Sequence, residues 1–145
     1  MSEYVYAAAQ EVAYNTPALL NTRIPCNRGL VFHSDGSGLI TLTGNSRIPC
    51  DRFVRYDVEY EANIAVPTGG TAGEIDLAIA IGGQAIPISI GASTPTVADA
   101  YNHVSGGMTI DVPRTVDYTA SVINTSVTAE PINVRNLRVK INPTR

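Results

Sequence analysis

Residues 54–66 read VRYDVEYEANIAV, and this stretch decides the fold. Apolar or small residues stand at every second position from Val54 to Val66, and most positions between them are polar or charged. Side chains of a β-strand point alternately to opposite faces, so this pattern predicts one long strand. One of its faces lies on a core. The other carries four charged residues toward solvent or a partner: Arg55, Asp57, Glu59 and Glu61.

The same period of two returns in later segments. Residues 75–81 alternate, and isoleucines follow at 86, 88 and 90 after Gly82-Gly83, which predicts two strands joined by a tight glycine turn. Residues 108–112 and 116–122 alternate on either side of Pro113-Arg114, which predicts a second hairpin.

Three further segments complete the sequence pattern. The final strand changes phase near Arg135-Asn136, which predicts a β-bulge. Residues 29–33 and 38–43 flank a turn-rich cluster and predict a hairpin with Ile40 and Leu42 facing inward. Residues 96–104, preceded by Pro95, are the one stretch that favours a short helix within a loop.

Length and composition favour a single domain over residues 1–145. Of the 145 residues 44% are hydrophobic and 16% are charged, while 12 Gly and 9 Pro are dispersed along the chain. About ten short strands without crossover helices predict an all-β antiparallel sandwich of the jelly-roll or Greek-key type.

Charge and hydropathy limit the classes of partner. The net charge of −3 offers no basic surface for nucleic acid or anionic lipid. No apolar run approaches the length of a membrane span, and the first residues have no signal-peptide pattern. We therefore expect no nucleic-acid partner, no membrane and synthesis in a cytoplasm. Nine of the ten basic residues are arginines, which favours fixed contacts on the surface.

Candidate chemistry is sparse. His33, Ser34 and Asp35 are the residue types of a hydrolase triad, but consecutive side chains do not converge, so a structural turn is the better interpretation. Cys26 and Cys50 lie in a repeated Arg-Ile-Pro-Cys tetrapeptide without metal-site companions, and partly buried free thiols are favoured over a disulfide. We expect no enzyme activity, no catalytic residue, no metal site and no cofactor.

The carboxylates of Asp57, Glu59 and Glu61 lie on one face of the same strand. They could bind calcium, yet calcium prefers a looped cage with backbone carbonyls. Pairing with charges on a neighbouring strand is the favoured interpretation.

The order of segments resembles a known family. Residues 21–29, 33–38, 62–71 and 110–114 are similar to small proteins of Firmicutes and their bacteriophages, which look like the tumour necrosis factor and complement globular-head superfamily. The segment Asn-Ile-Ala-Val-Pro-Thr-Gly-Gly-Thr at 63–71 is the most specific part. The resemblance implies a ten-strand jelly roll that assembles as a tight homotrimer.

The resemblance also implies a strand order and an interface. The strand of residues 54–66 would lie between that of 108–112 and the final one, which places Arg138 and Lys140 opposite the acidic residues. In the superfamily this face lies toward the neighbouring subunit, so we expect some of these pairs at the trimer interface. Tyr4, Tyr6 and Tyr101 are further interface candidates, because interfaces are enriched in aromatic residues.

These expectations lead to two functions. The first is a non-enzymatic virion protein, a trimer that decorates or cements the outer surface of a phage capsid and has the major capsid protein as its partner. The alternative is a receptor-binding or carbohydrate-binding head of a phage fibre or bacterial appendage. Its ligand loops would be residues 67–73 and 91–105, with Tyr101 and His103 as candidate contacts and Tyr101 as the sugar-stacking residue.

Overall fold

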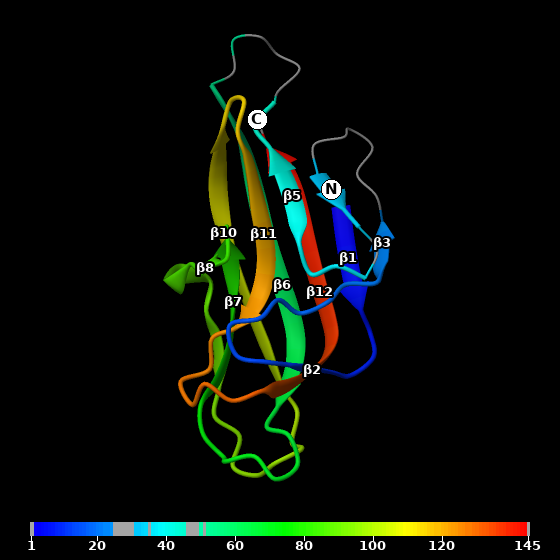
Figure 1. The fold of residues 1–145 in the computed structure, drawn as a ribbon, viewed down its shortest axis with the longest axis vertical. Coiled ribbons are helices and arrows are strands. Elements are labelled where there is room, and N and C mark those ends of the chain that lie inside the picture. Colours follow the sequence, from blue (N-terminus) through cyan, green and yellow to red (C-terminus); the bar gives the residue numbers. More distant parts are fainter. Residues whose placement is uncertain (1, 25–30, 35, 46–49, 51, 145) are drawn as a thin grey trace.

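Two antiparallel sheets pack face to face in the structure, a computed structural model (Figure 1). It describes residues 2–24, 31–34, 36–45, 50 and 52–144. The order of sheet A is β10 (Asn102–Pro113), β6 (Phe53–Ala65), β12 (Ile132–Thr144), β1 (Ser2–Tyr6) and β3 (Thr22–Ile24), with β2 (Gln10–Val12) also paired to β12. The order of sheet B is β4 (Val31–His33), β5 (Ile40–Thr43), β11 (Asp117–Asn124), β7 (Ile75–Ile81) and β8 (Gln84–Ala85), with β9 (Gly91–Ser93) also paired to β7. The predicted antiparallel jelly roll is confirmed.

Strand β6 is the long strand that the alternating pattern predicts. Its even-numbered side chains are buried, from Val54 at 6% exposed to Ile64 at 0%. The predicted neighbours are also confirmed, because β6 pairs with β10 on one side and with β12 on the other.

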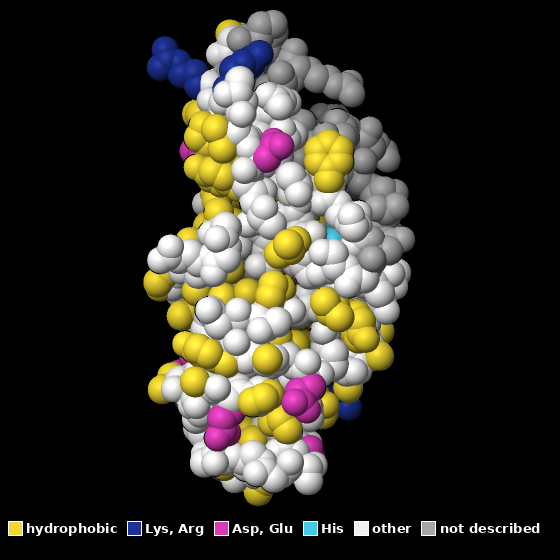
Figure 2. Space-filling view, in the orientation of Figure 1, with side chains coloured by type: hydrophobic (Ala, Val, Ile, Leu, Met, Phe, Trp, Pro, Cys, Tyr) yellow, Lys and Arg dark blue, Asp and Glu magenta, His cyan; other side chains and the backbone are white. Residues whose placement is uncertain are grey.

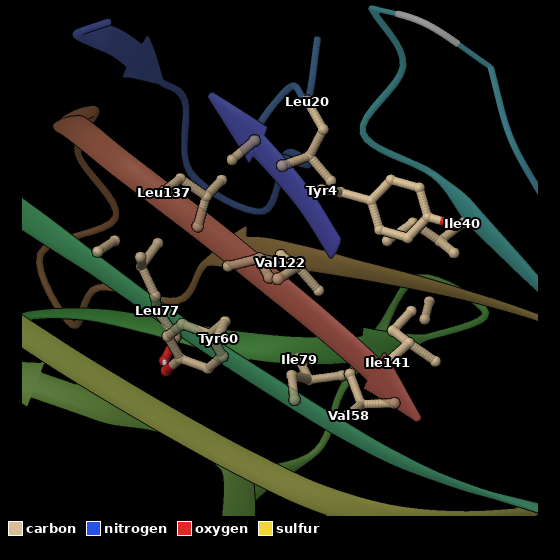
Figure 3. Packing of buried hydrophobic residues seen from close by; sticks show 14 of the residues in the cluster. Tyr4, Leu20, Ile40, Val58, Tyr60, Leu77, Ile79, Val122, Leu137 and Ile141 are labelled. Carbon is tan, nitrogen blue, oxygen red and sulfur yellow. Dashed lines mark hydrogen bonds between the residues drawn. The ribbon is translucent and has the colours of Figure 1, made fainter. Parts of the chain in front are cut away.

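The core lies between the sheets and is built from both (Figure 3). Val58 and Tyr60 of β6 and Leu137 and Ile141 of β12 meet Leu77, Ile79 and Val122 of sheet B. Burying these apolar side chains is the main favourable contribution to folding.

Two buried tyrosines of β6 also bind the sheets together by hydrogen bonds. The Tyr56 hydroxyl donates to the carbonyl of Thr43 in β5. The Tyr60 hydroxyl lies 2.7 Å from the carbonyl of Leu77 in β7 and 2.9 Å from that of Ser89. Burial raises the pKa of Tyr60, so the hydroxyl stays protonated and able to donate.

The predicted bulge in β12 is confirmed. Arg135 lies opposite Asn63 and Arg138 opposite Glu61, so β12 contains one residue more than β6 in this interval. Asn136 takes a φ of 52°, and asparagine is one of the few residues that adopt this left-handed conformation readily. Its N–H donates to the carbonyl of Ala7 at 3.2 Å.

The hairpin of β4 and β5 is confirmed as well. Ile40 and Leu42 point inward at 1% and 0% exposed. The connecting turn has Gly36 at a φ of 81° and a hydrogen bond from the Ser37 N–H to the Ser34 carbonyl. His33 is buried, with Nε2 2.7 Å from the Ser37 carbonyl, which agrees with a structural turn; Asp35 lies outside the described residues.

The second half of the predicted glycine hairpin is wrong. The turn at Gly82-Gly83 forms, but β8 ends at Ala85 and a single 3-10 turn, η1 (Pro87–Ser89), follows. Pro87, whose fixed φ suits the first position of a helical turn, begins η1, and Ser89 Oγ accepts from the Ile79 N–H at 2.8 Å in place of a strand carbonyl partner. Ile88 is therefore 82% exposed, although its spacing suggested a buried position.

Two other expectations are corrected. Residues 108–112 and 116–122 do not pair as a hairpin, because β10 belongs to sheet A and β11 to sheet B; alternation alone cannot distinguish a hairpin from a connection between sheets. Residues 96–104 contain no helix. Asp99 has a φ of 61° and its N–H donates to the Val66 carbonyl, and β10 begins at Asn102.

A bilayer-spanning helix is absent from the described part of the chain.

Candidate functional site

The outer face of sheet A, the side turned away from the core, brings together six of the predicted interface residues. Arg55, Asp57, Glu59 and Glu61 point outward from β6, because the residues between them are buried. Arg138 and Lys140 point outward from β12, opposite Glu61 and Glu59 respectively. We call these six residues the charged face.

The side of the molecule opposite the charged face is mostly uncharged (Figure 2). Figure 2 views the side that β5 and β11 form, and uncharged and hydrophobic side chains cover most of it. The charged face is therefore a local feature of sheet A.

Arg138 links three strands of the charged face. Its Nη1 lies 3.2 Å from Glu61 Oε1 on β6, and its Nε lies 2.9 Å from Glu3 Oε1 on β1. The predicted pairing of acidic residues with the final strand is confirmed for Glu61. Glu3 was missed, although its position next to the inward Tyr4 is the signal that would have placed it outward.

Arg55 forms a two-point ion pair with Asp111 of β10. Arg55 Nε lies 2.7 Å from Asp111 Oδ1 and Nη2 lies 3.0 Å from Oδ2. The hydrogen bond from Arg55 lowers the pKa of Asp111, and the same bond raises the pKa of Arg55. Because both side chains are nearly half exposed, this pair adds little to stability and more to the shape of the face.

A polar groove opens in the middle of the charged face. It has a volume of about 380 Å³ and is lined by Glu59, Glu61, Ser105, Gly107, Arg138 and Lys140, together with Tyr60 and Gly106. Gly107 lies opposite Glu59, and a Cβ atom there would lie only 3.3 Å from Glu59 Cγ. The missing side chain at Gly107 leaves this space.

Glu59 and Lys140 are adjacent across the ladder but are not ion-paired. Within the described ranges, no ion pair involves either residue. An opposite charge from outside the protomer could therefore engage each of them.

The calcium alternative for the three carboxylates gains no support. Asp57 Oδ1 accepts from the Thr109 hydroxyl at 2.8 Å, and Glu61 is engaged by Arg138. Among the residues that the structure describes, no group of three or more His, Cys, Asp or Glu side chains could hold a metal ion.

Tyr4 and Tyr6 do not belong to the charged face. Tyr4 is 2% exposed and points between the sheets beside Ile40 (Figure 3), with its ring centroid 4.9 Å from that of His33. Tyr6 is partly buried against the same core. The expectation that Tyr4 contributes to a subunit contact is therefore wrong, because its side chain fills the protomer's own interior.

Tyr101 and His103 lie near one end of sheet A. The Arg135 guanidinium carbon lies 3.9 Å above the Tyr101 ring, so one face of that ring already has a cationic partner. His103 lies on β10 opposite Asn63, with Nδ1 3.4 Å from Asn63 Oδ1, and not in a loop helix.

The two loops proposed for ligand binding are in contact. The Thr68 hydroxyl donates to Asp99 Oδ2 at 2.5 Å, and the Asp99 N–H donates to the Val66 carbonyl at 2.8 Å. These contacts fix the loop after β6 against the loop before β10.

Of the two cysteines, the structure describes Cys50. Cys50 is a free thiol and is exposed, where partial burial was expected. Cys26 lies outside the described residues.

Comparison with known proteins places the fold. No protein-family model matches the chain, and no curated protein matches it in sequence. The chain is similar in structure to the globular domain of a zebrafish complement 1qA protein, with a TM-score of 0.57 at 12% identity over 96% of this chain and 94% of that one. The sugar-binding C-terminal domain of EclA aligns with a TM-score of 0.37 at 13% identity, over 80% of this chain and 86% of that one. The first likeness shows a jelly roll of the complement globular-domain type.

Proposed function

We propose that this chain is a non-enzymatic structural protein that assembles as a homotrimer through the charged face and decorates the outer surface of a phage capsid. The observation that carries the proposal is the adjacent Glu59 and Lys140, which form no ion pair with any described residue, beside a groove of about 380 Å³ on a face where Arg55, Glu61 and Arg138 are ion-paired. A neighbouring subunit would supply the opposite charges.

The charge pattern suits a contact that specifies geometry. Charges across an interface contribute to the choice of partner and to register more than to affinity, and like charges brought together are costly. Arg138, held by Glu3 and Glu61, is fixed before assembly and would lose little freedom on binding. When each subunit binds a different surface of the next copy, the subunits form a closed ring if the rotation between neighbours divides a full turn evenly. The family resemblance implies a ring of three copies.

The capsid role rests on the family resemblance and on the geometry of a trimer. A trimer at a threefold or quasi-threefold position would contact several shell subunits at once. Linked contacts can raise the overall affinity by a factor on the order of 10² to 10⁴ without any new kind of contact. The protein would then be made in the bacterial cytoplasm and located on the virion, with the major capsid protein as its partner.

Sedimentation velocity at micromolar concentration tests the assembly step. We expect the wild-type protein to sediment as a trimer. Lys140→Glu should increase the monomer fraction at least tenfold, because it places a third carboxylate beside Glu59 and Glu61. Arg52→Glu makes the same charge change at an exposed position outside the charged face and is the matched control. A monomeric wild-type protein, or equal dissociation of the two variants, would contradict the proposal.

Copy number on the particle separates capsid decoration from the alternative head. The contact between Thr68 and Asp99, which joins the two candidate ligand loops, is the observation that favours a ligand-binding head. Quantitative mass spectrometry of purified virions should give hundreds of copies for a decoration protein and a handful for a fibre tip. Glycan-array binding that is lost in Tyr101→Ala would favour the head.

A further inference from the structure

A buried carboxylate at the start of β7 has no use in the assembly proposed above. Asp76 is 5% exposed, and its neighbours Ile75 and Leu77 point into the core, so Asp76 lies on the outer side of sheet B, away from the charged face. Its backbone is fully engaged: the N–H donates to Ser126 Oγ at 3.0 Å, and the carbonyl accepts from the Thr125 N–H at 3.1 Å. Its side-chain atom Oδ1 is buried without a hydrogen-bond partner.

The described surroundings of Asp76 supply no positive charge to balance its carboxylate. In the described part of the chain, no Lys, Arg or His side chain forms an ion pair with Asp76. Burial, together with the nearby Glu74 carboxyl group, raises the pKa of Asp76 to about 6. A carboxylate that is buried without a counter-charge is costly when it is ionised.

A second buried oxygen lies across the ladder. Thr125 is directly opposite Asp76, because its N–H bonds to the Asp76 carbonyl, and side chains opposite each other on neighbouring strands have Cβ atoms about 5 Å apart. Thr125 Oγ1 is also buried without a partner. The Ser126 N–H does not satisfy either oxygen, because it donates to Asn124 Oδ1 at 2.9 Å.

We propose that Glu74, Asp76 and Thr125 form a binding site for a divalent cation of the calcium type, which prefers oxygen ligands. Two carboxylates and a hydroxyl would supply the protein ligands, with water completing the shell. The site would join the β6–β7 loop to the β11–β12 loop, and the two loops lie close together, since a Cβ added at Gly73 would lie 3.5 Å from Thr128 Cγ2. A proton shared between Glu74 and Asp76 would neutralise one charge but would leave Thr125 Oγ1 without a partner.

Thermal unfolding with and without metal tests the site. The wild-type protein is stripped with a chelator, and its melting temperature is measured in the chelator, in calcium chloride and in magnesium chloride. At a calcium concentration about 100 times the Kd, a rise of roughly 5–10 °C is expected for a chain of this size. Calorimetric titration with calcium should show one binding site per chain, and this binding should be absent in Asp76→Asn.

Three variants distinguish this site from a general effect of salt. Asp76→Asn keeps the size of the side chain and removes the charge, so it should fold, melt no lower than the wild type in chelator and not respond to calcium. Thr125→Val should keep a calcium response with an affinity about tenfold weaker. Glu11→Gln, an exposed position on β2, removes one negative charge elsewhere and should respond as the wild type does. The proposal is overturned if calcium leaves the wild type unchanged or raises the melting temperature of Asp76→Asn equally.

Discussion

Arg138 and Glu61 face each other across β12 and β6, with Arg138 Nη1 3.2 Å from Glu61 Oε1, and the same guanidinium reaches Glu3 on β1. Three neighbouring strands are therefore connected on the outer face by one side chain. The Arg138 side chain is 45% exposed, so its ion pairs lie at the surface and contribute only modestly to the free energy of unfolding.

Arg138→Gln should lower the free energy of unfolding by about 1 kcal/mol, because the half-exposed Arg138 side chain loses two ion pairs that contribute a few tenths to 1 kcal/mol each. Urea denaturation of the protein in low salt measures the change. Arg52→Gln, at an exposed position outside the charged face, is the control and should change stability by less than about 0.5 kcal/mol, as Arg52 has no intramolecular ion pair in the described chain. Equal effects of the two variants would show that the Arg138 pairs contribute nothing.

Tyr60→Phe should lower the free energy of unfolding by about 1–3 kcal/mol, because the buried carbonyls of Leu77 and Ser89 lose their donor. The ring and its packing stay in place, so the effect isolates the hydroxyl. Tyr6→Phe, in a partly buried tyrosine near the same core, should cost well under 1 kcal/mol. Chemical denaturation of both variants makes the comparison.

Gly106→Ala should destabilise the protomer by about 3 kcal/mol or prevent folding, since its Cβ would lie 2.2 Å from the Ser89 carbonyl oxygen and 2.8 Å from Tyr60 Cε1. Gly107→Ala meets its nearest atom at 3.2 Å and should cost less than about 1 kcal/mol. The same Gly107 methyl group enters the groove of the charged face, so sedimentation should detect weaker assembly of a protomer that melts almost normally. A stable Gly106→Ala protein would contradict the packing of η1 against β10.

Asp76 should make the metal-free protein less stable as pH rises from about 4 to about 6. Its pKa is about 6 in the folded state against 3.8 in the unfolded state, so the folded state binds more protons in this window and stability falls with rising pH. A difference of about two units corresponds to at most about 3 kcal/mol, all of it lost above pH 6. The difference in unfolding free energy between wild type and Asp76→Asn, measured in chelator across pH 4 to 7, should follow this curve, and Glu11→Gln should not alter it.

Alternation predicted the strands well because a sandwich buries one face of each strand. The even-numbered residues from Val54 to Ile64 and the odd-numbered residues from Ile75 to Ile79 are buried as their spacing indicates, although in β7 the residues between them are buried as well. Alternation has no information on which strands pair, so the turn at Pro113-Arg114 was predicted as a hairpin although it connects the two sheets. The strand predicted from the isoleucines at 86, 88 and 90 does not form, because the chain turns into η1 at Pro87, whose fixed φ suits the start of a helical turn.

The candidate site could be predicted only in the part that depends on alternation. The outward charges of β6 and β12 follow from it once the bulge is counted. Tyr4 was predicted at an interface because aromatic residues are enriched there. The alternation of β1, in which Tyr4 points to the other face from its neighbours Glu3 and Val5, was given less weight. Asp76 was missed because a single acidic residue among isoleucine, leucine and alanine does not reveal, in sequence, which loops will cover it.

The bulge at Asn136 has a consequence for how the protein can vary in length. From Ile132 and Val134 onward, an uninterrupted alternation over all residues would turn residues 138 and 140 toward the core, but the bulge absorbs one extra residue and Leu137, Val139 and Ile141 lie inward. Removing one of the two residues between Val134 and Leu137 would therefore leave these three side chains in phase with Ile132 and Val134 and would remove only the bulge. Related chains that keep the charged face can keep the bulge or lack it, and a scan of single-residue deletions along β12 should find its most tolerant point here.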